Sequence, residues 1–229
     1  MSISPELYRR IPIDPARDFT AVTQLSSTTN FLMVSSALPV RNLAEFVSYA
    51  RANPGKIDYG SMGIGSTGHL DTLALERATG VQLNHVPFKG AAPVILELTQ
   101  GRLGVFFSSV GTLLVPPIKE GKVRLLGVAD RSRSEQYPDV PTFIEQGTDL
   151  VVGTWLGLVA PAGTPPKIVA RIAADVARIV RDPAFETKHI RPQGLKSVGN
   201  TPAEFADYLK QNRAYWSEVI RASGLKLEL

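Results

Sequence analysis

Short apolar runs alternate with segments of helical period along the first 130 residues. The run FLMVSS at 31–36 predicts a buried strand, and the apolar positions of residues 41–52 fall on one face of a helix. The same alternation predicts further strands at 56–60, 83–87, 103–107 and 123–129, a helix at 67–79, and a helix that ends at Gly101. Strands separated by helices of this length favour right-handed crossovers and a mainly parallel sheet, so we predict an α/β fold.

Capping signals mark the ends of several of these helices. Asn42 and Glu45 form a capping pair at the start of the helix at 41–52. Gly80 is placed to close the helix at 67–79 in a left-handed conformation. The stretch 110–121 has a helix-like pattern, which we expect Pro116-Pro117 to break.

The last third of the chain is dominated by two predicted helices. Thr164 is expected to cap the first, with Pro165 in its first turn. The apolar stripe of this helix is predicted to be Ile168, Ile172, Val176 and Ile179. Thr201 and Glu204 form a second capping pair, which opens a long helix that runs to Gly224.

A glycine-rich segment, YGSMGIGSTGH at 59–69, follows a predicted strand and opens a predicted helix. Amides at a helix N-terminus are unpaired, and the helix dipole adds positive potential there. The glycines allow close approach to the main chain, and Ser61, Ser66 and Thr67 supply hydroxyl groups. The segment therefore predicts an anion-binding turn that needs no lysine or arginine. Asp71, in the first turns of the helix, is expected to interact favourably with the dipole.

Two other interpretations of this turn remain open. Gly63, Gly65 and Gly68 match the G-x-G-x-x-G pattern of dinucleotide-binding sites. Such a site needs an acidic residue after the next strand, and that strand ends in Asn84-His85-Val86-Pro87. Alternatively, the glycines only cap the helix and shape the turn.

Composition excludes several classes of function. The net charge is only +4 and the basic residues are dispersed, so the sequence does not predict a nucleic-acid-binding protein. There is no cysteine, and the three histidines are too far apart in sequence to form a local metal motif. No serine lies in a G-x-S-x-G motif with an assignable histidine and acid, so neither an enzyme nor a cofactor is predicted.

Six ordered blocks of sequence carry a resemblance to a known family. They are LYRRIPIDPARDFTAV, ANPGKIDYGSMGIGSTGHL, HVPFKGAAP, IKEGKVRLLGVA, YPDVPTF and WLGLVAPAGTP, and TPAEFADYLK extends the match toward the C-terminus. On these blocks the chain resembles the Bug family, the TctC-like solute receptors of tripartite tricarboxylate transporters. Members of that family resemble type II periplasmic binding proteins, with two α/β lobes joined by hinge strands.

The resemblance implies a division of the chain. Residues 1–34 would be a remnant of the first lobe and the hinge, 35–128 the second lobe, and 129–229 a crossover and C-terminal helices that return to the first lobe. Family members begin with a secretion signal, a strand and a second glycine-rich loop. None of these precedes Met1, so we expect the chain to be N-terminally truncated and its first lobe to be incomplete.

The resemblance also implies a function and a site. The protein would be a periplasmic, monomeric, non-enzymatic receptor that captures a small organic carboxylate and presents it to the membrane permease subunits of the transporter. The implied ligand-binding residues are Ser61, Met62, Gly63, Gly65, Ser66, Thr67, His69, Ser108 and Ser109. His85 is interpreted as structural. A nucleotide-dependent enzyme and a non-functional truncated paralogue remain the alternatives.

Overall fold

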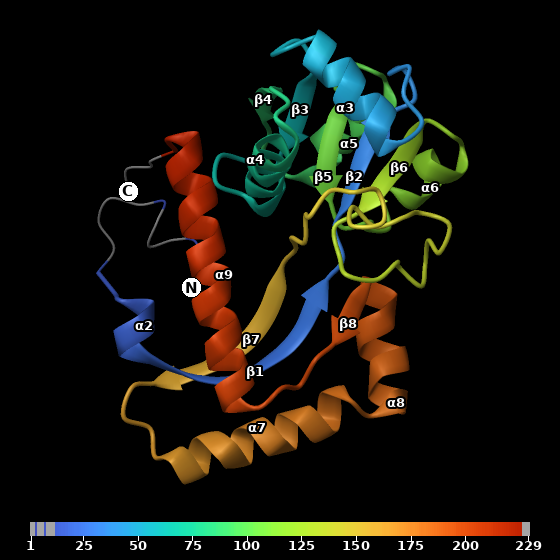
Figure 1. Cartoon of the computed structure of the whole chain (residues 1–229). Helices are drawn as coiled ribbons and strands as arrows, with labels where there is room; N and C mark the ends of the chain where they lie inside the picture. The colour runs from blue at the N-terminus through green and yellow to red at the C-terminus, as the bar shows by residue number, and fades with distance from the viewer. Residues whose placement is uncertain (1–2, 4–6, 8–11, 226–229) are drawn as a thin grey trace. The chain divides into compact units, whose positions relative to one another are not determined.

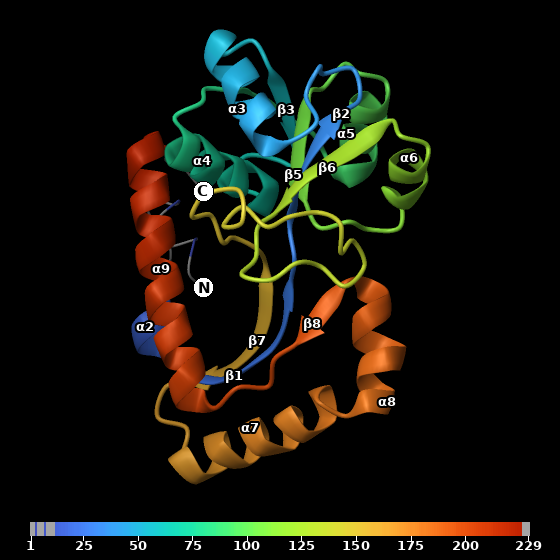
Figure 2. The same cartoon turned by 45° about the vertical axis from the view of Figure 1, so that its right-hand side comes forward.

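A computed structural model of the chain describes residues 3, 7 and 12–225. Contacts divide the chain into two units. Unit 1 comprises Met1–Thr28 and Trp155–Leu229, and unit 2 comprises Thr29–Thr154 (Figures 1 and 2). The predicted second lobe, 35–128, lies within unit 2, which extends further at both ends.

Unit 2 is built on a five-stranded sheet in the order β4-β3-β5-β2-β6. Its strands are β2 (Phe31–Ser35), β3 (Asp58–Ser61), β4 (Asn84–Pro87), β5 (Val105–Ser108) and β6 (Val123–Val128). β3 runs parallel to β4 and β5, whereas β2 runs antiparallel to both β5 and β6. The mainly parallel sheet is confirmed with this exception, since an apolar run such as β2 carries no information about its direction.

Helices cover the sheet of unit 2. They are α3 (Leu43–Ala52), α4 (Thr67–Thr79), α5 (Ala91–Thr99) and α6 (Val115–Lys119). Val94 and Leu98 of α5 pack in one buried cluster with Met33 and Phe106. Side chains alternate along a strand, so the buried Phe107 points to the opposite face.

Local signals decided where these helices begin and end. The Asn42 side chain accepts a hydrogen bond from the Glu45 amide, and Gly80 closes α4 with φ +69°, both as predicted. The expectation for the proline pair was wrong. α6 contains Pro116 in its first turn, where the ring removes no helical hydrogen bond, so the prolines begin this helix instead of breaking it.

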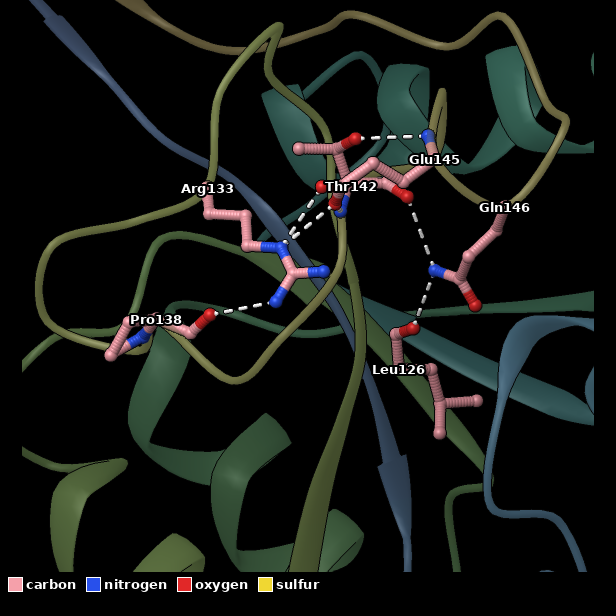
Figure 3. Close-up of polar contacts among 6 residues, drawn as sticks. All are labelled: Leu126, Arg133, Pro138, Thr142, Glu145 and Gln146. Atoms are coloured by element: carbon pink, nitrogen blue, oxygen red, sulfur yellow. Dashed lines mark hydrogen bonds and ion pairs between the residues drawn. The ribbon is translucent and has the colours of Figure 1, made fainter.

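The segment after β6, which the sequence suggested as part of a crossover, belongs to unit 2 as far as Thr154. Figure 3 shows how its polar groups are held. The Arg133 guanidinium pairs with the Glu145 carboxylate at 2.9 Å, and the Glu145 amide donates to Thr142 Oγ1 at 3.0 Å. Gln146 Nε2 donates to the Leu126 carbonyl at 3.0 Å, which fixes the segment to β6.

Unit 1 contains a three-stranded antiparallel sheet in the order β7-β1-β8. Its elements are α2 (Pro15–Asp18), β1 (Phe19–Thr28), β7 (Trp155–Pro161), α7 (Pro166–Val180), α8 (Pro183–Phe185), β8 (Leu195–Ser197) and α9 (Pro202–Ser223). The capping box of Thr201 and Glu204 opens α9, and Gly224 ends it at φ +69°. Both ends of this helix were predicted correctly.

α7 differs from its prediction in its cap and in its buried face. Thr164 does not cap it, because its hydroxyl donates to the Pro161 carbonyl at 2.7 Å. The buried residues are Val169, Ala173 and Val180, and the first two pack against Val22 and Ala160. The predicted stripe lies beside this face, with Ile168, Ile172 and Ile179 exposed by 50%, 39% and 44%. The small side chain of Ala173 lets this row approach the sheet, which periodicity alone does not reveal.

Among the described residues, no helix combines the length and the apolar character that a bilayer-crossing segment requires.

Candidate functional site

The glycine-rich turn of unit 2 is built around the hydroxyl of Ser61. This residue ends β3 and is fully buried. Its Oγ accepts a hydrogen bond from the Gly63 amide at 3.1 Å and lies 3.0 Å from the Gly63 carbonyl. It is also 2.7 Å from Nε2 of His85. The Ser61 hydroxyl therefore bonds to the main chain of Gly63 within the turn, and it links the turn to His85 on β4.

His69 holds the second half of the turn. The Gly65 amide donates to Nδ1 of His69 at 2.9 Å. This nitrogen must be unprotonated to accept, so the neutral ring carries its hydrogen on Nε2. Burial, together with the neighbouring His85, lowers the pKa of His69 to about 4. The environment of His69 thus favours a neutral imidazole whose Nδ1 accepts the hydrogen bond.

Three rings stack beneath the turn. The rings of His69 and His85 are nearly parallel, with centroids 3.9 Å apart, and His85 stacks on Tyr59 at 4.8 Å. Tyr59 and His85 are direct partners in the parallel β3–β4 register. Burial also lowers the pKa of His85. His85 is therefore structural, as predicted, but it supports the turn through Ser61, a role that the sequence did not indicate.

The hydrogen bonds of the turn decide which amides remain for a ligand. The amides of Gly63, Gly65 and Ser66 donate within the turn, the last to the Gly63 carbonyl at 3.1 Å. Among the described residues, no acceptor is recorded for the amides of Thr67, Gly68 and His69, the first three residues of α4. The available donors therefore lie at the helix start, where the dipole is positive.

Ser66 adds a hydroxyl to these amides. It is the N-cap residue of α4, yet its side chain makes no capping hydrogen bond. Its Oγ is buried and has no partner within the described part of the chain. The hydroxyl of Thr67, by contrast, accepts from Thr154 Oγ1 at 3.3 Å. Ser66 thus adds a hydroxyl without a recorded partner next to the available amides.

Glycines are required at several points of the turn. Gly63 and Gly65 have φ values of +123° and +77°, which residues with a side chain rarely adopt. A Cβ atom on Gly68 would lie 2.6 Å from the Phe107 carbonyl oxygen. The third glycine of the dinucleotide-like pattern is therefore explained by the packing of α4 on β5.

The remaining predicted residues lie at the end of β5 and in the turn itself. Ser108 follows Phe107 at the end of β5, so it is one residue away from the Gly68 contact. No hydrogen bond recorded in the described residues joins Ser108 or Ser109 to the turn. Met62 and Ile64 are 41% and 53% exposed, which places two apolar side chains beside the polar groups.

Asp71, which the sequence suggested as a partner of the helix dipole, lies in an environment that disfavours its charge. It is fully buried, and Asn30 Nδ2 donates to its Oδ2 at 2.6 Å. Burial raises the pKa of this carboxyl to about 7, because an ionised carboxylate is costly away from water. Charge on Asp71 is therefore suppressed in acidic solution.

Other potential sites in the molecule are distinct from this turn. A cavity of about 470 Å³ lies in unit 1, lined in part by Phe19, Leu209 and Lys210, and none of the predicted site residues contributes to it. No group of histidine, aspartate or glutamate in the described residues could hold a metal ion. β4 lacks the acidic residue that a dinucleotide site requires.

Solved structures of similar proteins share the fold of this chain. A Rhodopseudomonas palustris protein solved with bound malate, MatC, is 30% identical with a TM-score of 0.75, and the match covers 94% of this chain and 74% of that one. An R. palustris protein solved with adipate is 32% identical with a TM-score of 0.80, covering 96% and 74%. The periplasmic binding protein BugD is 28% identical with a TM-score of 0.78, covering 99% and 76%.

Curated relatives give the same result. A protein from the tcbD-tcbE intergenic region of Pseudomonas sp. strain P51 is 33% identical over 93% of the chain, and BugT of Bordetella pertussis is 26% identical over all of it. The chain spans 63% of the length of the Pseudomonas relative and 70% of BugT. The model of the tripartite tricarboxylate transporter family receptor matches residues 1–225. The chain therefore belongs to the TctC family of tripartite tricarboxylate transporter receptors.

Proposed function

We propose that the chain is a receptor whose turn at residues 61–69 binds the carboxylate of a small organic acid. The observation that carries this proposal is the set of available donors at the start of α4: the amides of Thr67, Gly68 and His69 and the buried hydroxyl of Ser66. They converge on the N-terminus of a 13-residue helix, which favours negative charge. The finer role of each residue is part of the proposal.

Recognition at this turn would be by neutral groups. Residues 61–69 contain no lysine or arginine, and the environment of His69 disfavours its charged form. Hydrogen bonds to a charged acceptor are each worth roughly 1.5–3 kcal/mol, so a few amides supply useful affinity without a counter-charge. The adipate and malate in the solved relatives are both dicarboxylates, which supports this class of ligand.

Titration calorimetry with adipate, malate and citrate tests the proposal. We expect at least one of them to bind with a stoichiometry near one. Ser66→Ala should weaken that binding by roughly tenfold, because a charge-assisted hydrogen bond is lost. Ser48→Ala, on the exposed side of α3, is the matched control and should bind like the unchanged protein. Equal affinity in all three proteins would exclude Ser66, and the absence of any binding would overturn the proposal.

We further propose that the protein acts as a monomer in the periplasm and presents the bound acid to the permease subunits of its transporter. The family membership and the periplasmic relatives support this proposal. Uptake of the identified acid into vesicles that contain the permease should depend on the receptor and should be reduced by Ser66→Ala. Uptake that is independent of the receptor would exclude this role.

A further inference from the structure

Asp71 is a buried acid in the helix that presents the proposed carboxylate-binding amides. Its side chain is 0% exposed, and Asn30 donates to one of its two carboxyl oxygens. The other oxygen, Oδ1, is buried and has no partner in the described part of the chain. A carboxyl group held in this way by one neutral amide is more stable protonated than ionised.

Among the residues that the structure describes, no charged group is recorded as compensating an ionised Asp71. α4 packs against β3 and β5, and β5 carries no titratable residue. The titratable residues on α4, on the adjacent strands and beside Asn30 are Asp58, Tyr59, His69, Glu76, Arg77, His85 and Asp130. None of them contributes to the pKa of Asp71, which burial raises and the Asn30 hydrogen bond partly lowers. A negative charge bound nearby would therefore repel an ionised Asp71, and none of these residues would offset that repulsion.

We propose that Asp71 is a proton-binding site coupled to the ligand site, so that a carboxylate bound at the start of α4 is accompanied by a proton taken up from solution. The proton adds to a carboxyl oxygen of Asp71, and no other bond in the protein changes. This inference rests on the proposed function of the turn. Two negative charges on one helix repel, so the bound anion favours the neutral form of Asp71, and neutral Asp71 favours the anion. Thermodynamic linkage makes the two effects equal.

The geometry sets the size of the coupling. Asp71 lies two to four residues after the available amides, which is about 3–6 Å along a helix that rises about 1.5 Å per residue. A bound anion would lie about 3 Å beyond the amides, at hydrogen-bond distance, so the two charges would be roughly 8 Å apart. With an effective dielectric constant of about 20–40, the repulsion corresponds to about a tenfold change in affinity. Ligand affinity is therefore expected to be higher in acid and to fall as the pH rises through the pKa of Asp71.

Calorimetry with adipate, or with malate if adipate does not bind, measures this coupling directly. Titrations at about pH 6 to 8.5, in two buffers of different ionisation enthalpy, give both the affinity and the number of protons taken up. We expect the dissociation constant to rise about tenfold over this range, with net proton uptake near neutral pH. Asp71→Asn keeps the neutral shape, and its binding should be independent of pH without proton uptake. Asp58→Asn on β3 is the control and should behave like the unchanged protein.

These measurements distinguish a failure of the proposed ligand binding from a failure of the proposed role of Asp71. If no dicarboxylate binds at any pH, the proposed function itself fails. Binding with a constant affinity and no proton uptake in the unchanged protein would overturn the role of Asp71 alone. The histidines beside the turn do not confuse this test, because burial holds the pKa values of His69 and His85 below their ordinary range. If Asp71→Asn does not fold, proton uptake by the unchanged protein still decides.

Discussion

The central strand β2 of unit 2 is buried along its whole length, whereas exposed and half-buried residues alternate along most of β7 in unit 1. β2 has a hydrogen-bonded strand on each side, and apolar side chains cover both of its faces. Among the described strands β7 pairs with β1 alone, and its Leu156 is 53% exposed. The difference teaches that a central strand such as β2 contributes to the core along its whole length, whereas an edge strand such as β7 leaves part of its side chains exposed.

The largest expected effect is in the core of unit 2. The Phe107 ring is completely buried and stacks on Phe143 with centroids 5.9 Å apart. Phe107→Ala should lower the free energy of unfolding by about 3–5 kcal/mol, because it removes buried surface and leaves a cavity. Leu156→Ala in unit 1 should change it by less than about 1 kcal/mol. Urea titration measures both values. A comparable loss in the two variants would mean that Leu156 is covered in solution and that the contrast is false.

A smaller effect is expected where α4 meets the sheet of unit 2. Gly68→Ala places a methyl group against the Phe107 carbonyl oxygen. Relieving this clash requires a shift of the β5 main chain or of α4, which costs folding free energy. We expect a loss of about 1–3 kcal/mol in unfolding free energy, together with weaker carboxylate binding because the amides of α4 are displaced. Gly111→Ala faces open space and is the control in the same unit. A Gly68→Ala protein with unchanged stability and affinity would show that this contact is not tight.

The pH dependence of stability should reveal two opposing groups on α4. Asp71 has its pKa raised from 3.8 to about 7, so its contribution is present below pH 3.8 and is lost as the pH rises to about 7. His69 has its pKa lowered from 6.5 to about 4, so its contribution is present above pH 6.5 and is lost as the pH falls to about 4. Between about pH 4 and 6.5, a rise in pH therefore lowers the contribution of Asp71 to stability and raises that of His69.

Asp71→Asn should remove the Asp71 trend and leave that of His69. The unfolding free energy of this variant, relative to the unchanged protein, should rise by roughly 3 kcal/mol from about pH 4 to 6.5, because the pKa of Asp71 is raised from 3.8 to about 7. Urea titrations at several pH values measure this difference. A difference that stays constant with pH would show that Asp71 is ionised in the folded protein.

The smallest expected effect is one that the two units should share. Asn42→Ala removes a helix cap in unit 2, and Thr201→Ala removes one in unit 1. Each should cost about 1 kcal/mol, since a cap acts within one helical turn and does not depend on the surrounding core. Thr164→Ala, which removes no cap, should cost less. Very different losses of unfolding free energy in the two cap variants would show that the contribution of a helix cap depends on the unit around it.

Much of the local structure could be predicted because its causes are local. Caps such as Asn42 and Thr201, and the glycine turn before α4, depend on residues within a few positions of each other. The direction of β2 and the buried face of α7 could not be predicted in this way. They depend on which distant residues meet them, such as Val22 and Ala160 for α7.

The candidate site shows the same limit. The sequence indicated an anion-binding turn, but it treated all of the amides between Ser61 and His69 as equivalent. Only the structure shows that the turn uses Gly63, Gly65 and Ser66 internally, which leaves the first turn of α4. The bond between His85 and Ser61 joins residues 24 positions apart, and it depends on the β3–β4 register, which pairs Tyr59 with His85 and which the predicted strand bounds did not give.

The polypeptide enters unit 2 at Thr29 and leaves it at Thr154, and both connections are hydrogen-bonded to α4. Asn30 bonds to Asp71 near the entry, and Thr154 bonds to Thr67 at the exit. One helix thus serves as a common anchor for both ends of the unit. A small rotation of α4, whether caused by a solute at its first turn or by a mutation, would pull on the two connecting segments at the same moment.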